Sequence, residues 1–343
     1  MKTTKKQMLT YFLLLFMGSA ISQEYFVHPH EGLDTNPGTM ESPFKSIEKA
    51  VFTANLLTGS GDITIHLMPG TYVLENKIAI NPVRVPTDST SFIIKGHYLP
   101  DHSNWSPENM PTIQSISGNN SSTFFGHSVG FLVAARNVVF QGIRFLGNSN
   151  PQVKYYYPIT KENPELGNLS VMQCMFIGDK ESSKIQGGIW AHGPNNIVDH
   201  SVFYECRNAV LFFDNVEGFR ISNSIIYKSY ESAFWFGPED MKFEFYNNVL
   251  SQNEHLLVGR SKDLKYSSPL QESIISGGTK VGYWSRAEGR IVPIKNPDIV
   301  LTNISKSMSI SIIENDGAVL PKRHLHLGNW SKKETAPGIF MKK

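Results

Sequence analysis

The chain repeats a short pattern in which polar residues lead into an apolar, strand-like ending. Six segments end on a large apolar residue, and these last residues are 31, 27, 23, 24 and 25 positions apart. The six anchor residues are Phe145, Phe176, Phe203, Ile226, Leu250 and Ile275. A period in the mid-twenties without helical spacing is typical of one coil of a β-solenoid, so we expect the anchor residues to stack.

A second set of short apolar strands lies between these segments. Its members are bounded by Gly, Pro, Asn, Asp or Ser, as strands usually are. They cover residues 188–192, 209–213, 233–237, 255–259 and 281–284. Two or three such strands per coil, each paired with the same strand of the next coil, would form parallel sheets around one continuous core.

Polar residues or glycine recur three positions before each anchor residue. They are Gly142, Gln173, His200, Asn223, Asn247 and Glu272. At a bend of a solenoid such side chains can stack into a hydrogen-bonded ladder. We therefore interpret His200 as a structural residue rather than a catalytic one.

Helical spacing is confined to residues 44–56. The apolar residues there are Phe44, Ile47, Val51 and Leu56. We expect a helix that caps the open end of the solenoid, because an uncovered coil exposes its core and strand edges to water. Residues 101–127 and 149–168 are too long for one coil and predict loop insertions, which form either binding walls or plain surface loops.

Several N-terminal segments resemble a known superfamily. They are Tyr25-Phe26-Val27-His28-Pro29, Asn36-Pro37-Gly38-Thr39, Ser42-Pro43-Phe44-Lys45-Ser46-Ile47-Glu48-Lys49-Ala50-Val51 and Ile63-Thr64-Ile65-His66-Leu67-Met68-Pro69-Gly70-Thr71-Tyr72. These segments resemble the opening and first coil of the right-handed parallel β-helix proteins of the pectate-lyase-like kind, and the resemblance covers about residues 24 to 290. It implies an all-β, single-stranded, right-handed parallel β-helix (a solenoid) with an N-terminal capping helix and long loop insertions.

The first 22 residues have the pattern of an export signal. Three lysines precede an apolar run over residues 8–17, and a small-x-small cleavage pattern follows at residues 20–22. We expect a periplasmic or extracellular protein. The expected divisions are a signal peptide at 1–22, a β-helix domain at 23–328 with its cap at about 40–58 and its coils at about 62–315, and a polar C-terminal tail at 329–343.

Charge and composition narrow the range of partners. The chain has 32 Lys+Arg and 30 Asp+Glu, and without residues 1–22 the basic residues number 29. This balance does not favour nucleic acid as a partner. Outside the signal, no stretch approaches the roughly 18 apolar residues of a membrane span. We expect a soluble monomer.

The two cysteines, Cys174 and Cys206, are too few for a disulfide framework or a zinc cluster. We interpret them as buried thiols or one incidental bridge. A chain of this length can build a core without such cross-links.

Strand alternation predicts an aromatic stripe on one outer face. If Ile189, Val210 and Phe234 point inward, their neighbours point outward on adjacent coils. The outward residues are then Trp190, Leu211 and Trp235, followed by His192, Phe213 and Gly237, and Trp284 joins them if the register holds. Flat aromatic faces stack on sugar rings, so we favour a carbohydrate groove. The alternative is a second small core under the loops.

Basic residues outnumber acidic ones in the turns beside this stripe. The charged or titratable residues there are Lys184, Arg207, Asp214, Glu239, His255, Arg260, Lys280 and Arg286. In a nearly neutral protein, local positive charge beside aromatics favours an anionic sugar such as a uronate or a sulfated residue. The predicted ligand is thus an anionic polysaccharide or oligosaccharide.

Many members of the resembled superfamily are polysaccharide lyases, and β-elimination on a uronate suits these residues. The reaction needs positive charge at the carboxylate, a base and a proton donor. We predict His192 as the base, Arg260 as the cation and Tyr283 as the acid. The predicted substrate-binding residues are Trp190, Trp235, Trp284, Lys184, Arg286 and Phe213. At a free non-reducing end the same elimination would expel water, as a dehydratase does.

We expect no cofactor. Some members of the superfamily use calcium, which remains possible here, but no tight Asp/Glu cluster along one strand resembles their calcium site, and no metal ligands are predicted.

Two alternatives remain open. A glycoside hydrolase would use paired carboxylates, and Asp214 and Glu239 occupy matching turns of neighbouring coils, about 5 Å apart if they stack. A non-catalytic glycan-binding solenoid would need the aromatic residues but no base. The sequence contains no nucleophile elbow, P-loop or dinucleotide motif that would support another chemistry.

Overall fold

The protein is described by a computed structural model. It describes residues 22–123, 125–237, 240–241, 243–263, 265–266, 270–271, 273–276, 280–295, 301–302 and 337–341. Of the predicted signal peptide, only residue 22 lies within the described ranges. Glu239 lies outside them. Within the described ranges, no helix is long and apolar enough to cross a membrane.

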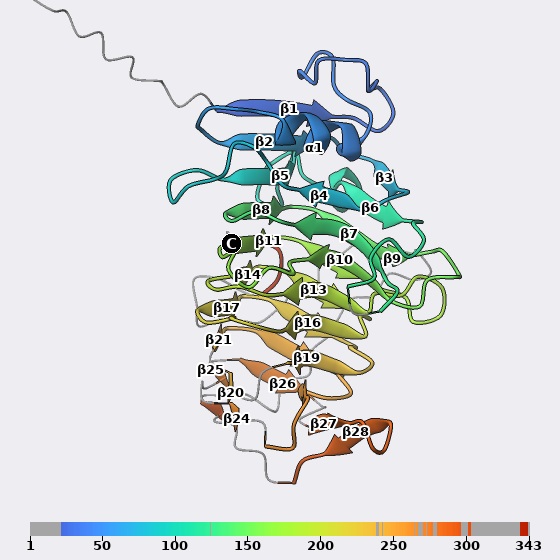
Figure 1. Ribbon diagram of the computed structural model, residues 1–343, viewed down its shortest axis with the longest axis vertical. Helices are drawn as coiled ribbons and strands as arrows, with labels where there is room; N and C mark the ends of the chain where they lie inside the picture. Colours follow the sequence, from blue (N-terminus) through green and yellow to red (C-terminus); the bar gives the residue numbers. More distant parts are fainter. Residues whose placement is uncertain are drawn as a thin grey trace, which may run out of the picture.

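Three parallel sheets run the length of the molecule, and successive strands of the chain pass from one sheet to the next (Figure 1). Sheet A comprises β1 Gln23–Val27, β2 Ile63–Leu67, β5 Phe92–Gly96, β8 Val138–Gln141, β11 Leu169–Met172, β14 Ile197–Asp199, β17 Phe219–Ser222, β21 Phe243–Tyr246, β25 Leu270–Gln271 and β29 Leu301–Thr302. Sheet B comprises β3 Thr71–Leu74, β6 Thr112–Ser115, β9 Arg144–Asn148, β12 Met175–Ile177, β15 Val202–Tyr204, β18 Ile225–Tyr227, β22 Val249–Ser251 and β26 Ile274–Ser276. Sheet C comprises β4 Ile78–Ile80, β7 Ser128–Val133, β10 Tyr156–Thr160, β13 Gly187–Ala191, β16 Asn208–Phe212, β19 Ser232–Phe236, β23 Leu257–Gly259, β27 Val281–Ser285 and the antiparallel β28 Arg290–Pro293.

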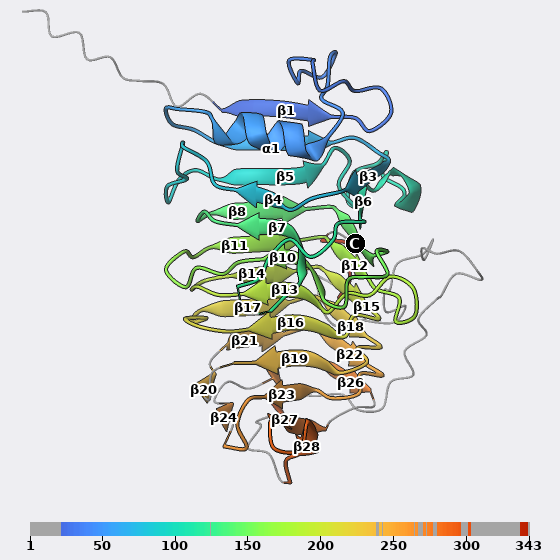
Figure 2. The same ribbon diagram turned by 45° about the vertical axis from the view of Figure 1, so that its right-hand side comes forward.

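This arrangement is a right-handed parallel β-helix, as the sequence predicts. Figure 2 shows the coils stacked from the N-terminal end, with β1, to the hairpin of β27 and β28 at the other end. Apart from the helix, three small elements of the described residues lie outside the three long sheets. They are the strands β20 Asp240–Met241 and β24 Lys265–Tyr266, which pair with each other, and a 3₁₀ turn at Pro107–Asn109.

The six anchor residues stack in one column of sheet B, as predicted. Their strands pair in an unbroken register from Phe145 through Phe176 and Phe203 to Ile275. The rings of Phe176 and Phe203 lie 4.7 Å apart and nearly parallel. All six side chains are buried, because the same face of every coil points into the core.

The predicted polar ladder is present at the bend between sheets A and B. Gln173, His200, Asn223 and Asn247 all have left-handed backbone conformations, with φ between 47° and 53°. The Asn247 amide donates to Asn223 Oδ1 at 2.6 Å, and the Asn223 amide donates to Asp199 Oδ1 at 2.8 Å. His200 is buried in the same column, but neither of its ring nitrogens has a hydrogen-bond partner among the described residues, so the ladder bonds run through Asn247, Asn223 and Asp199. Glu272 lies outside the described residues.

The helix α1 Ile47–Asn55 covers the N-terminal edge of sheet C. Ser46 caps it, because its side chain accepts a hydrogen bond from the Lys49 amide. The inward face of α1 is apolar and buried, and Asn55 donates to the Ala79 carbonyl of β4. The helix thus takes the place of the strand that sheet C lacks in the first coil.

The outer face of sheet B is covered by two segments from distant parts of the chain. Ile339, in the described segment 337–341, is fully buried there among Met175, Val202 and Ile225. Its carbonyl accepts a hydrogen bond from Gln173. The second segment contributes Trp105, whose ring packs against the neighbouring Phe340. Part of the region predicted as a polar tail therefore belongs to the packed structure.

Both cysteines are free and fully buried, which confirms one of the two readings of the sequence. Burial raises the pKa of the Cys174 thiol to about 12, so this side chain is protonated and inert at neutral pH.

We expect Phe203→Ala to lower the free energy of unfolding by about 3–5 kcal/mol, because it opens a cavity in the middle of the anchor column. Phe52→Ala is the control, since Phe52 lies on the outer face of α1 and is 61% exposed. Chemical denaturation followed by circular dichroism would measure both. Equal effects of the two substitutions would contradict the stacked core.

Candidate functional site

The outer face of sheet C carries the aromatic stripe that strand alternation predicts. Ile189, Val210 and Phe234 pair in register and are buried in the core. Trp190, Leu211 and Trp235 pair in the same way but belong to a separate outer cluster.

Loops cover the part of the stripe nearest the N-terminus. Trp190 is only 2% exposed, because the rings of Phe125 and His127 from the segment before β7, and of Tyr157 from β10, pack around it. The structure therefore combines the two readings of the sequence: a small second core at one end and an open pocket beside it. Gly187 leaves space for the Leu211 side chain, because a Cβ at position 187 would lie 1.8 Å from Leu211 Cδ1.

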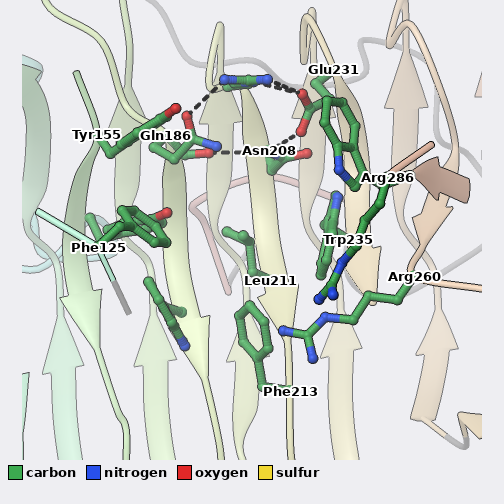
Figure 3. Close-up of a pocket in the computed structure, with 14 residues that line it drawn as sticks. Phe125, Tyr155, Gln186, Asn208, Leu211, Phe213, Glu231, Trp235, Arg260 and Arg286 are labelled. Carbon is green, nitrogen blue, oxygen red and sulfur yellow. Dashed lines mark hydrogen bonds and ion pairs between the residues drawn. The ribbon is translucent and has the colours of Figure 1, made fainter. Parts of the chain in front are cut away.

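The pocket has a volume of about 540 Å³. We call it the aromatic pocket. It is lined by Phe125, Tyr155, Tyr157, Gln186, Trp190, Arg207, Asn208, Leu211, Phe213, Glu231, Trp235, Arg260, Trp284 and Arg286. Apolar rings form its floor and one wall, and polar groups lie along its rim (Figure 3).

A hydrogen-bonded network holds the polar rim in place. Arg207 Nε donates to Glu231 Oε2 at 2.7 Å, and the Asn208 amide donates to Glu231 Oε1 at 3.0 Å. Arg207 also donates to Gln186 Oε1. The network spans three successive coils. Its planar side chains carry both hydrogen-bond donors and acceptors, and sugar hydroxyls can pair with either kind.

Two arginines form the cationic end of the pocket. The Arg260 guanidinium lies over the rings of Phe213 and Trp235, with 5.3 and 5.6 Å between the guanidinium carbon and the ring centres. In Figure 3 the side chains of Arg260 and Arg286 extend into the pocket from the same side, opposite Phe125 and Tyr155. Both arginines are exposed to solvent. Stacking on aromatic rings orients a guanidinium while its N–H groups stay free for an anion.

His192 lies below the pocket and is not one of its lining residues. Its side chain is 5% exposed, and its Nε2 accepts a hydrogen bond from Trp190 Nε1 at 3.0 Å. Nδ1 accepts a hydrogen bond from the Asp214 backbone amide at 3.3 Å and lies 3.7 Å from Asp214 Oδ2. Burial lowers the pKa of His192, and the positive charges of Arg260 and Lys161 add to this effect while Asp214 opposes it. His192 thus faces outward as predicted, stacked on Phe213 of the outer cluster, but it is covered rather than accessible.

The other predicted site residues are distributed around the pocket. Trp235, Trp284, Phe213, Arg260 and Arg286 all line it. Tyr283 lies next to Trp284 on β27 but is absent from the lining. Lys184 lines a neighbouring pocket instead. Of the alternative carboxylate pair, Asp214 is 78% exposed beside His192, and Glu239 lies outside the described residues.

Sequence reasoning missed Gln186, Asn208 and Glu231 as site residues. One signal could have found the ion pair: Arg207 and Glu231 are 24 positions apart, which equals one coil, so they are neighbours in the stack. Phe125, which covers Trp190, could not be found from the coil period, because it lies in a loop insertion that does not follow that period.

The described residues include no group of three His, Cys, Asp or Glu side chains placed to hold a metal ion. Calcium prefers six to eight oxygen ligands, and Glu231 is the one carboxylate in the lining of the aromatic pocket. A lining with one carboxylate offers calcium fewer charged oxygen ligands than it usually takes.

The fold and site together define a parallel β-helix protein with an aromatic, arginine-bearing pocket on one outer sheet. Residues 30–255 match the model of the family described as a protein of unknown function, DUF1565, and the chain belongs to that family. No curated protein matches the chain.

Solved structures with some likeness include a rhamnogalacturonan lyase with 12% identity and a TM-score of 0.42, over 76% of this chain and 66% of that chain. The lacto-N-biosidase GH136 from Eubacterium ramulus has 11% identity and a TM-score of 0.46, over 83% of this chain and 68% of that one. Pectin methylesterase PemA from Erwinia chrysanthemi has 11% identity and a TM-score of 0.32, over 84% and 92%. The likeness concerns the fold, and the activities belong to those proteins.

Lys161 is a buried lysine whose backbone pairs with Trp190 and His192 of the next coil. It is fully buried, its Nζ donates to Asn196 Oδ1 at 3.0 Å, and its carbonyl accepts from the His192 amide. Burial lowers the pKa of Lys161 from 10.5 to about 7. Asn196 Oδ1 also accepts from the Leu169 amide, so it keeps a partner when the lysine is replaced.

We expect Lys161→Met to remove a pH dependence of stability. Between pH 7 and 10.5 the unfolded chain binds more protons at this lysine than the folded chain does. The lysine therefore makes the free energy of unfolding rise with pH, by up to about 1.4 kcal/mol per pH unit. Urea denaturation across this range would measure the difference between wild type and variant, with the exposed Lys262→Met as control. A parallel pH profile for wild type and Lys161→Met would refute this prediction.

Proposed function

We propose that the protein binds uronic-acid-containing glycans in the aromatic pocket and acts on them by β-elimination. The observation that carries the proposal is the pair Arg260 and Arg286 at one end of a pocket whose floor is aromatic. A uronate combines a ring with apolar C–H faces and a carboxylate, and the pocket offers a complementary surface to each.

The proposed orientation of the sugar follows from this division of the pocket. Its ring lies over Leu211 and Phe213, and its carboxylate faces Arg260 and Arg286. Its hydroxyls then lie toward the rim of Gln186, Asn208 and Glu231, which can donate and accept hydrogen bonds. An exported location, expected from residues 1–22, suits a protein that meets polysaccharides outside the cell.

The arginines would contribute most to elimination. Removal of the C5 proton leaves negative charge on the carboxylate, and cations placed there stabilise the transition state. The C5–H bond breaks, its electron pair forms the C4–C5 double bond, and the oxygen at C4 departs with a proton. The departing group is a sugar in a lyase and water in a dehydratase.

Proton transfer requires two further groups at the pocket. Tyr157 lines the pocket, and we assign its hydroxyl as the group that donates a proton to the departing oxygen as negative charge develops there. We assign the base to Glu231 rather than to the covered His192. Each Glu231 oxygen accepts a hydrogen bond from the rim, and a carboxylate has about four acceptor sites, so it can still accept a proton.

A second candidate function is glycan recognition without catalysis. The observation in its favour is that both carboxylate oxygens of Glu231 already accept hydrogen bonds from Arg207 and Asn208, while His192 is engaged by Trp190. A recognition protein would bind the same glycans and release them unchanged.

We expect Arg260→Ala to weaken binding of uronate oligosaccharides by about 10- to 100-fold, since it removes charged hydrogen bonds to the carboxylate. Calorimetric titration with galacturonic acid oligomers would measure this. The matched control is Arg136→Ala, which removes an arginine outside the pocket that pairs with Asp88. If the neutral, reduced oligomers bind as tightly as the acids, the ligand is not recognised as a uronate.

We expect Glu231→Gln to lower the elimination rate by about 100-fold or more while binding changes only a few-fold, because the amide keeps the shape but cannot accept the proton. Ultraviolet absorbance of the unsaturated product and mass spectrometry would follow the reaction. Loss of one water without chain cleavage identifies a dehydratase, and shortened unsaturated chains identify a lyase. New reducing ends without unsaturation would replace elimination by hydrolysis, and tight binding without turnover would favour recognition.

A further inference from the structure

A second pocket adjoins the aromatic pocket on the outer side of sheet C. It has a volume of about 460 Å³, and we call it the basic pocket. It is lined by Lys154, Lys180, Glu181, Lys184, Gln186, Arg207, Tyr230, Glu231, Glu254, His255 and Ile291. Its lining lacks the stacked aromatic floor of the first pocket and is rich in charge.

The two pockets meet at the polar rim. Gln186, Arg207 and Glu231 line both of them. One face of the Arg207–Glu231 pair therefore borders the aromatic pocket, and another borders the basic pocket. A ligand longer than one sugar could lie across this pair without leaving the groove.

Positive charge dominates the basic pocket once the internal pairs are counted. Glu231 is paired with Arg207, and Glu254 is paired with Lys280 at 2.9 Å, which lowers the pKa of Glu254. Among the described residues of this pocket, three lysines have no carboxylate within ion-pair distance. These are Lys154, Lys180 and Lys184, against the single remaining carboxylate of Glu181.

Two of these lysines lie against aromatic rings. Lys154 Nζ lies 5.1 Å from the ring centre of Tyr155, and Lys180 Nζ lies 5.7 Å from that of Tyr230. Such contacts restrict a long side chain while its three donors remain available. The pocket therefore presents partly ordered ammonium groups to an anion.

We propose that the basic pocket is a second subsite, and that the ligand is an oligosaccharide with anionic groups on successive sugar residues. The inference rests on the proposed function, since it extends the site of the aromatic pocket. One acidic sugar occupies the aromatic pocket against Arg260 and Arg286. The next sugar crosses the Arg207–Glu231 pair and places its carboxylate or sulfate ester among Lys154, Lys180 and Lys184.

The test compares ligand lengths in calorimetric titrations of the full chain. The probes are galacturonic acid, its tetramer and a chondroitin sulfate tetrasaccharide, which carries both carboxylates and sulfates. The variants are Lys180→Ala/Lys184→Ala, Arg260→Ala and, as control, Lys262→Ala, which removes an exposed lysine outside both pockets.

We expect the double lysine variant to bind one or both tetramers about 5- to 10-fold more weakly, with a smaller salt dependence, and to bind the monosaccharide as wild type does. A loss confined to the sulfated tetramer assigns the subsite to sulfate, and a loss for the galacturonic acid tetramer assigns it to carboxylate. Arg260→Ala should weaken all probes, because each of them places a carboxylate in the aromatic pocket.

Other outcomes distinguish a failure of the second subsite from a failure of the proposed function. Unchanged tetramer binding in the double lysine variant, with losses in Arg260→Ala, overturns the second subsite and leaves the proposed function standing. Losses in the lysine variant without any in Arg260→Ala overturn both, as does failure of every probe to bind the wild-type chain.

Discussion

The parallel pairing of each coil with the next, in constant register, is the constraint on which the rest of the molecule depends. Because Phe145, Phe176 and Phe203 share one column, each coil presents its apolar face to the same core. A slip of one residue would turn these rings outward and bring polar neighbours inward. The positive-φ ladder at Asn223 and Asn247 strengthens this register, since its hydrogen bonds form only when the bends lie above one another.

The same register builds the candidate site from residues that are far apart in sequence. Arg207 and Glu231 meet because they are one coil apart, and Trp235 lies beside Leu211 for the same reason. The packing of the core fixes the spacing of the strands and therefore of their outward side chains. The floor of the pocket is held in place by the same strands that build the core. Along the stack the pocket changes from covered rings at Trp190 to guanidinium groups toward Arg286, and the polar rim follows one edge across three coils.

The sequence allowed the fold to be predicted because the signals for it are local and repeated. The anchor spacing, the alternation around Trp190 and Trp235 and the capping helix all follow from period and polarity, and the structure agrees with them. The site was only partly predictable. Alternation gives the direction of a side chain but not what covers it. Trp190 and His192 were expected in an open groove, but Trp190 packs against Phe125 of a loop insertion, and His192 is buried beside Trp190 and Phe213. Glu231 escaped notice because a charged turn residue has no special signature unless its partner one coil away is considered.

The return of the C-terminal segment has a consequence for how the chain reaches its native state. A solenoid whose coils touch only their neighbours can fold progressively from one end. Here the Met341 amide donates to Asp101, across 240 positions of sequence, and Gln173 bonds to the Ile339 carbonyl across 166. Contacts of such long range carry a large loop-closure cost and slow the steps that form them. The outer face of sheet B is therefore completed only when residues 337–341 dock against strands that lie far earlier in the chain.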